Sequence, residues 1–144
     1  MTPFPSDEQS GFYDEHLDDA YQRAEYVFHQ FVLQVGVHDP GLDAWLAQHD
    51  FLTYAFMTPY NPHSNALPAV ENEARMTDLL KVLRGRGIPF VPAEGRDPAG
   101  EWPTEHGVFL FDQPATEVHE LARSFGQNAV VEGKLGGVGF LVWL

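Results

Sequence analysis

Residues 51–58, FLTYAFMT, form a continuous apolar run that has the length of one strand. A strand with one face in solvent alternates apolar and polar residues, and this run has no polar face to turn outward. The rest of the chain must therefore cover the run on both faces. We predict a central strand in a sheet that has other elements packed against it.

Four segments have the spacing or the end signals of helices, at residues 13–23, 39–50, 69–84 and 114–126. In the second segment Asp39 is expected to be the N-cap, with Pro40 in the first turn. The last segment is expected to end at Gly126. The longest helix is expected to bury an apolar stripe that consists of Val70, Ala74, Leu79, Leu80 and Leu83.

Further segments are typical of strands, at residues 26–36, 88–95, 107–111, 128–133 and 137–144. Pro89 and Pro92 favour an edge or irregular position for the strand at 88–95. The sequence DPAG at residues 97–100 has the composition of a β-turn. The glycines of GKLGG, at residues 133–137, predict a hairpin between the last two strands.

The order of these elements predicts an α+β fold in a single globular domain. We expect a single-layer mixed, largely antiparallel sheet of about five to six strands, packed with three to four helices. Residues 11–144 would form this domain. Residues 1–10 are polar and contain two prolines, which predicts a flexible tail.

The chain has 21 acidic and 8 basic residues, a formal net charge of −13 at pH 7. This charge repels a phosphate backbone and argues against direct nucleic-acid binding. It fits either a solubility requirement, as in an acidic cytoplasm, or a surface that engages a basic partner. The sequence lacks cysteine, a secretory signal and a long apolar segment, so we expect a cytoplasmic protein without a membrane span.

Two polar clusters lie between the central strand and the long helix. The first is TPYNPHSN, at residues 58–65, which includes Asn61. A loop that follows a strand is a common ligand position in α/β folds, but Asn and Ser also form turns and caps there. The second contains Asn72 and Arg75, three residues apart on one helical face. Arg75 could hold a carboxylate or phosphate, or it could pair with Glu71.

The third cluster, EGRDPAGEWPTEH at residues 94–106, includes Arg96, Asp97, Trp102 and Glu105. Carboxylates, an arginine and an indole at short spacing suit acid–base chemistry when their environments separate the pKa values. The same residues would also suit a charged β-turn with the indole folded over the edge of the sheet.

Gln127 and Asn128 form the fourth cluster, between the last helix and an apolar strand. Their amides could bond backbone groups at the sheet edge, or could bind the polar edge of a base or an amide. The chain has no dinucleotide, P-loop or zinc signature, and its seven histidines are scattered. No metal site is therefore predicted, and any cofactor is left unknown.

The four clusters together resemble a bacterial family known only as domain of unknown function 3293. The family has a T-A-W-N-P-x-S loop, an N-x-x-R helix start, a G-x-D-P-x-G-x-W-x-E turn and an F-G-Q-N-A segment before a strand. The chain has TPYNPHS at 58–64, NEAR at 72–75, GRDPAGEWPTE at 95–105 and FGQNAVV at 125–131. AYQRAEY at 20–26 is similar to the family's opening.

The chain departs from the family pattern at two places. Pro59 and Tyr60 replace a small residue and a tryptophan, and Gly107 stands where a serine is common. If that serine takes part in chemistry in relatives, this chain has lost it. The resemblance implies that the polar residues belong to one recurring pattern, and it implies no activity.

We expect the four clusters to converge on one concave site for a polar small molecule that is anionic or nucleotide-like. Trp102 would stack on the ligand, and Glu105 would be the catalytic acid or base of an enzyme. The predicted ligand-binding residues are Asn61, Asn72, Arg75, Arg96, Asp97, Trp102, Gln127 and Asn128. The alternative is a non-enzymatic module whose acidic surface binds a basic protein, with the clusters serving as structural bonds.

Overall fold

The computed structural model describes residues 13–144. The tail expected at residues 1–10 lies outside this range, so the domain boundary stays a prediction. The helices are α1 (Glu15–Arg23), α2 (Pro40–Gln48), α3 (Ala69–Arg86) and α4 (Ala115–Ser124), with a short 3-10 turn at Pro62–Ser64. The strands are β1 (Glu25–Phe28), β2 (Phe31–Leu33), β3 (Thr53–Met57), β4 (Phe90–Arg96), β5 (Glu105–Phe111), β6 (Ala129–Lys134) and β7 (Phe140–Trp143).

The strands form one sheet in the order β2-β1-β4-β5-β3-β6-β7, and each neighbouring pair is antiparallel. The α+β class and the largely antiparallel sheet are confirmed, but within residues 13–144 the sheet has seven strands and none of its pairs is parallel. The expected single strand at 26–36 is a hairpin, in which Phe28 pairs with Phe31 across a two-residue turn. His29 takes a positive φ of 50° in this turn, which divides the expected strand in two.

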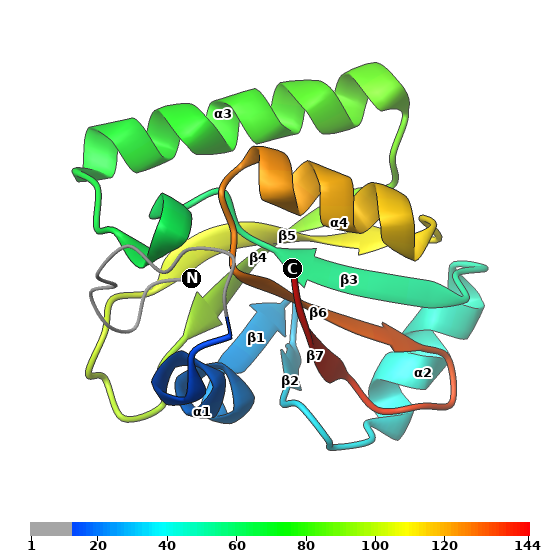
Figure 1. The fold of residues 1–144 in the computed structure, drawn as a ribbon. Helices are drawn as coiled ribbons and strands as arrows, with labels where there is room; N and C mark the ends of the chain where they lie inside the picture. Colours follow the sequence, from blue (N-terminus) through cyan, green and yellow to red (C-terminus); the bar gives the residue numbers. More distant parts are fainter. Residues whose placement is uncertain (1–12) are drawn as a thin grey trace.

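The central strand β3 is covered on both faces, as predicted, because its side chains alternate between two cores. Tyr54 and Phe56 belong to an aromatic cluster shared with α1 and α2. Ala55 and Met57 belong to an aliphatic cluster that includes residues of α3 and α4. Figure 1 shows α3 and α4 over one face of the sheet and α1 and α2 toward the other.

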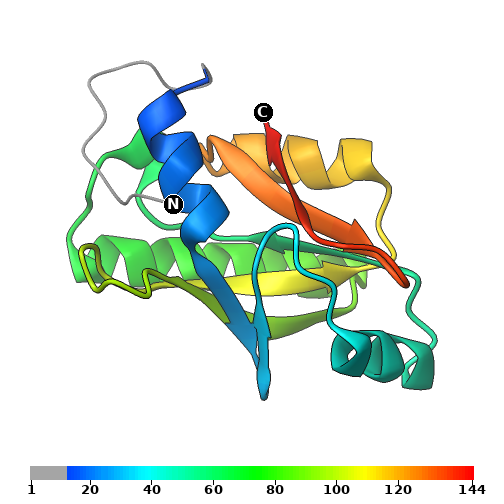
Figure 2. The same ribbon diagram turned by 90° about the horizontal axis from the view of Figure 1, so that it is seen from below.

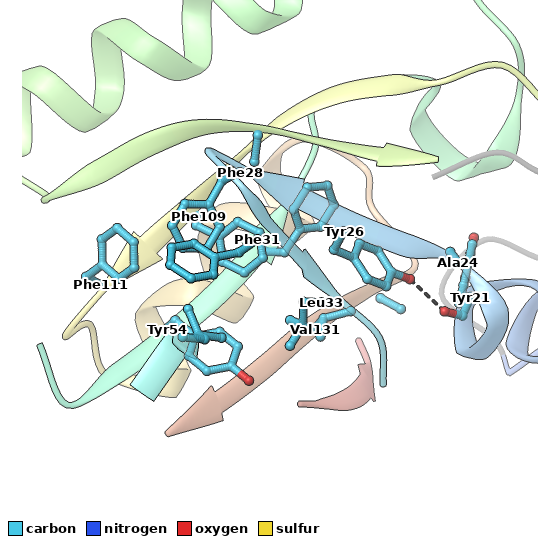
Figure 3. Close-up of a cluster of buried hydrophobic side chains, with 14 of the residues drawn as sticks. Tyr21, Ala24, Tyr26, Phe28, Phe31, Leu33, Tyr54, Phe109, Phe111 and Val131 are labelled. Atoms are coloured by element: carbon cyan, nitrogen blue, oxygen red, sulfur yellow. Dashed lines mark hydrogen bonds between the residues drawn. The ribbon is translucent and has the colours of Figure 1, made fainter. Parts of the chain in front are cut away.

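The aromatic cluster is built from rings of β1, β2, β3 and β5 (Figure 3). The ring centroids of Phe28 and Phe109 lie 4.7 Å apart, and those of Tyr26 and Phe56 lie 4.9 Å apart. Tyr26 is fully buried, and its hydroxyl donates to the carbonyl of Tyr21 at 2.7 Å. This hydrogen bond ties α1 to the core and satisfies a phenol that has no access to water.

The sheet curls until its two ends meet. The backbone N–H of Gly36, after β2, donates to the carbonyl of Gly139, before β7, at 2.9 Å. Figure 2 shows the segment after β2 passing beside β7. A Cβ at Gly139 would lie 3.2 Å from the hydroxyl of Tyr54 and 3.4 Å from Leu33. Gly139 therefore permits the close approach that shuts this side of the aromatic cluster.

Two expectations about the elements are corrected in part. Strand β4 lies inside the sheet, but β1 pairs only with its last residues, so Pro92 sits where β4 has β5 as its only partner. In α3, Leu79 and Leu83 are buried, whereas Val70 is 72% exposed and Asn72 is buried. The start of α3 thus turns a polar side chain, not an apolar one, toward the protein.

Candidate functional site

Seven polar side chains are buried in the described part of the chain, and all lie toward one end of the sheet. Antiparallel pairing explains this, because the carboxyl end of β3 lies beside the amino ends of β5 and β6. Segments distant in sequence therefore meet there. The buried residues are Thr58, Asn61, Ser64, Asn72, Glu105, Gln127 and Asn128.

Asn61, Asn72 and Glu105 form one connected group, which we call the Asn61 network. The Nδ2 of Asn72 donates to Asn61 Oδ1 at 2.8 Å, and the backbone N–H of Asn61 donates to Asn72 Oδ1 at 2.9 Å. The Nδ2 of Asn61 then donates to Glu105 Oε2 at 2.6 Å. The backbone N–H of Leu67 also donates to Asn61 Oδ1, at 2.9 Å. Helix α3 and strand β5 are thereby fixed to one loop.

Arg75 and Gln127 meet at the carboxyl end of α4, which we call the Arg75 corner. Arg75 Nε donates to the carbonyl of Pro59 at 2.6 Å, and its Nη2 donates to the carbonyl of Phe125. Gln127 Nε2 donates to the carbonyl of Tyr60 at 2.9 Å and to that of Phe125 at 3.3 Å. A guanidinium at a helix carboxyl end also complements the helix dipole. Arg75 and Gln127 therefore share the Phe125 carbonyl as a hydrogen-bond acceptor.

Asn128 joins a third group with Tyr21 and Ser64. Its Nδ2 donates to Ser64 Oγ at 2.6 Å and lies 3.4 Å from the Tyr21 hydroxyl. The Oδ1 of Asn128 is buried and has no hydrogen-bond partner among residues 13–144. Leaving such an acceptor unpaired costs about 1–3 kcal/mol.

Burial shifts the pKa values of groups around this end of the sheet. Desolvation raises the pKa of Tyr21 to about 12, although hydrogen bonds to Ser64 and Asn128 act in the opposite direction. Desolvation also raises the pKa of Tyr26 well above its ordinary value. It lowers the pKa of Arg75, against the opposing effect of the Asp78 carboxylate. Tyr21 and Tyr26 are thus neutral at physiological pH.

The loop that carries Asn61 is held in an unusual backbone conformation. Asn61, His63 and Ser64 have φ values of 50°, 56° and 60°, in the left-handed region that non-glycine residues rarely adopt. The N–H of His63 donates to the carbonyl of Gly126 at 2.7 Å. A Cβ at Gly126 would lie 2.7 Å from Pro62 Cβ, so the loop packs directly on this glycine.

The third sequence cluster joins the site only through Glu105. Arg96 pairs with Glu25 at 2.9 Å, and Asp97 accepts the N–H groups of Ala99 and Glu101, which shapes the predicted β-turn. Trp102 is buried in the aromatic cluster. Within residues 13–144, no hydrogen bond or ion pair links Arg96, Asp97 or Trp102 to the Asn61 network.

Tyr21 and Thr58 take part here although neither is among the predicted ligand-binding residues. Thr58 belongs to the first predicted cluster, at residues 58–65. Tyr21 lies on the buried face of α1, and its hydroxyl adds a polar contact to Ser64 and Asn128. Thr58 Oγ1 donates to the carbonyl of His106 at 2.5 Å and accepts the N–H of Tyr60 at 3.1 Å. For Tyr21, the sequence signal of this polar contact is weak: a tyrosine stands on a buried helix face where a leucine or phenylalanine would also fit.

Two further observations concern the described residues. Among residues 13–144, no group of three or more histidine, aspartate or glutamate side chains could hold a metal ion. No helix in the same part of the chain is both long and apolar enough to span a bilayer.

The fold and this end of the sheet define an α+β protein with a curled seven-stranded antiparallel sheet and a buried amide–carboxylate network. The family described as "Protein of unknown function (DUF3293)" matches residues 57–130, just over half of the chain. The chain belongs to this family. Comparison with curated proteins and with solved structures finds no match. The matched segment includes every member of the Asn61 network and both side chains of the Arg75 corner.

Proposed function

We propose that the protein binds a small ligand carrying a carboxylate or phosphate group at the Arg75 corner. The observation that supports this is that the Arg75 guanidinium has N–H donors left without an acceptor among residues 13–144. Arginine has five N–H donors, and Arg75 commits two of them to the carbonyls of Pro59 and Phe125. No carboxylate among residues 13–144 lies within ion-pair distance of Arg75.

The fixed position of Arg75 adds to this argument. An exposed arginine loses side-chain entropy when it binds an anion, but the two carbonyls already hold this guanidinium in place. Arg75 is half-buried, so an ion pair there is screened less than one at the open surface. A planar guanidinium can also contact two oxygens of one carboxylate or phosphate at once.

Neighbouring rings offer contacts for the remainder of such a ligand. A Cβ at Gly126 would lie 3.4 Å from His63 Nε2, which places this imidazole beside the Phe125–Gly126 peptide that Arg75 contacts. The ring centroids of Tyr60 and His106 lie 5.9 Å apart. In the proposed complex these exposed or half-buried rings, rather than the buried Trp102, would pack against a ring of the ligand.

The Asn61 network has a supporting role in this proposal. It fixes the loop whose Pro59 and Tyr60 carbonyls orient Arg75 and Gln127. Glu105 is 1% exposed and accepts from Asn61, so it would act as an acid or base only toward a ligand that reaches this loop. A nucleotide-like ligand and an enzymatic reaction are finer hypotheses that rest on the same corner.

The test is a binding titration with inorganic phosphate, AMP and acetate, followed by backbone NMR shifts at a temperature where every variant is folded. Arg75→Ala is expected to abolish saturable shifts of Tyr60, His63 and Gly126. Arg84→Ala is the matched control, because it removes an exposed arginine from the same helix. If no ligand produces saturable shifts in the parent protein, or if Arg75→Ala binds as the parent does, the proposal is wrong.

The alternative, an acidic module that binds a basic protein, draws on the net charge of −13 and on the acidic residues of α1. Several of these carboxylates already have partners: Asp14 caps α1, Asp19 pairs with Arg23, and Asp18 accepts from Trp143 Nε1. A lysine-rich peptide that shifts α1 amides at low salt and not at high salt would support this alternative. Uniform shifts over the whole surface would argue against it.

A further inference from the structure

A cavity of about 220 Å3 lies toward the other end of the sheet from the Arg75 corner. Its floor is a row of side chains in register across four strands. Leu110 pairs with Ala55, Ala55 pairs with Glu132, and Glu132 pairs with Phe140. The wall is the start of α4, through Ala115 and Val118. The lining is therefore mostly apolar, with one carboxylate in the middle of the floor.

One carboxylate oxygen of Glu132 accepts a hydrogen bond within residues 13–144, and the other does not. His119 Nε2, on α4, donates to Glu132 Oε1 at 2.5 Å. The other carboxylate oxygen has no hydrogen-bond partner among residues 13–144. The side chain of Glu132 is only 13% exposed. A shielded carboxylate oxygen beside an apolar cavity favours a ligand that brings a charged hydrogen-bond donor.

We propose that this cavity binds a small organic amine, with its ammonium group on Glu132 and its apolar body over Ala55, Leu110 and Val118. The site is separate from the Arg75 corner and does not rest on the function proposed there. A cavity of roughly 150 Å3 is known to hold benzene, so a cavity of about 220 Å3 has room for a ring and a short chain.

Two further features favour a cation over a neutral or anionic ligand. Phe140 stands directly across from Glu132 in the sheet and lines the same cavity, so its ring can contact an ammonium group held by the carboxylate. The net charge of −13 raises the local concentration of cations near the surface. Lys134 lies at the rim and is exposed, so solvent screens its repulsion.

The experiment compares benzylamine with benzyl alcohol, its neutral counterpart, by titration of the full chain monitored by NMR. Benzylamine is expected to give saturable shifts of Ala55, Val118 and Glu132, with a Kd at least tenfold lower than that of benzyl alcohol. Glu132→Gln keeps an acceptor for His119 and removes the charge, so benzylamine should bind at least tenfold more weakly. Glu120→Gln, at an exposed position of α4, should leave the Kd unchanged.

Ala115→Phe provides a second test that leaves Glu132 in place. Ala115 is exposed and lines the cavity, so a larger side chain should block the cavity and abolish the binding of both compounds without unfolding the protein. Arg75→Ala should leave benzylamine binding as in the parent protein. Equal affinity for the two compounds, unchanged benzylamine binding in Glu132→Gln or in Ala115→Phe, or no saturable shift at these residues would each overturn the proposal.

Discussion

Asn61 and Asn72 bind each other twice, once through two side-chain amides and once through a side chain and the backbone. The two distances are 2.8 and 2.9 Å, and both residues are buried. Asn72 lies in the first turn of α3, while Asn61 lies in the loop after β3. This pair fixes the position of the helix relative to the sheet with directional bonds, where an apolar contact would allow sliding.

We predict that Asn72→Ala lowers the free energy of unfolding by about 2–3 kcal/mol, because a buried N–H of Asn61 loses its acceptor and Asn61 Oδ1 loses a donor. Urea unfolding followed by tyrosine and tryptophan fluorescence measures the loss. Glu73→Gln, one position along and exposed, is the control and should change stability by less than about 0.5 kcal/mol. A loss below 1 kcal/mol for Asn72→Ala would contradict the importance of this pair.

A side chain at Gly107 should destabilise the sheet. A Cβ there would lie 2.3 Å from the carbonyl oxygen of Met57, a backbone atom that can move only with its strand. We expect Gly107→Ala and Gly107→Ser to cost about 2 kcal/mol or more. Gly95→Ala is the matched control, since its nearest atom is a Phe56 ring carbon at 3.4 Å. If both serine and alanine are tolerated, β3 and β5 can separate more easily than the structure indicates.

The left-handed backbone at Asn61, His63 and Ser64 predicts that one substitution will stabilise the protein. His63 has a φ of 56°, and glycine adopts this conformation without the steric cost that other residues bear. His63→Gly should therefore raise the free energy of unfolding by up to about 1 kcal/mol. Ser64→Gly, at φ 60°, relieves similar strain but removes the hydroxyl that accepts from Asn128, and we expect a net loss. A loss in both variants would show that the imidazole holds the loop in place.

The raised tyrosine pKa values predict a loss of stability at alkaline pH. The pKa of Tyr21 is about 12 in the folded protein against 10.0 for an unperturbed tyrosine, so the unfolded chain ionises first as pH rises. Tyr54 behaves in the same way. The stability that the neutral Tyr21 and Tyr54 side chains contribute is fully present below about pH 10 and is lost between about pH 10 and 12.

Urea midpoints at pH 9 and pH 11 test this prediction. Tyr21→Phe should reduce the decline between these pH values by roughly 1 kcal/mol, because one ionisable group no longer favours the unfolded chain. The pKa of Tyr13 is also raised, by desolvation and by the carboxylates of Asp18, Glu15 and Asp14, but this side chain is exposed to solvent. Tyr13→Phe should therefore reduce the decline by less than Tyr21→Phe does. If the free energy of unfolding declines equally in the parent protein and in both variants, groups other than Tyr21 cause the alkaline sensitivity.

Local signals predicted the parts of the fold that depend on few residues. Asp39 caps α2 and Asp97 closes its turn with side-chain hydrogen bonds to nearby N–H groups, as expected from sequence. The all-apolar run at residues 51–58 correctly predicted a strand between two cores. The hairpin of β1 and β2 was missed because it turns on His29 and Gln30, which lack the usual Asn-Gly or Gly signal.

The candidate sites could be predicted less fully, since their geometry depends on long-range register. Polar residues near 61, 72, 75, 105 and 127 were identified from sequence, but their partners are mostly main-chain carbonyls and one another. The cavity on the α4 face left no sequence signal at all. It depends on Ala55, Glu132 and Phe140 sharing one row, and strand order and register do not follow from the sequence of any one strand.

The bond between Gly36 and Gly139 has a consequence for how this protein behaves at high concentration. Exposed edge strands recruit other chains through their unpaired N–H and carbonyl groups. Here the backbone that follows edge strand β2 bonds the backbone that precedes edge strand β7, within a single molecule. The fold thereby shortens the stretch of backbone on which intermolecular strand pairing, the first step toward fibrils, could begin.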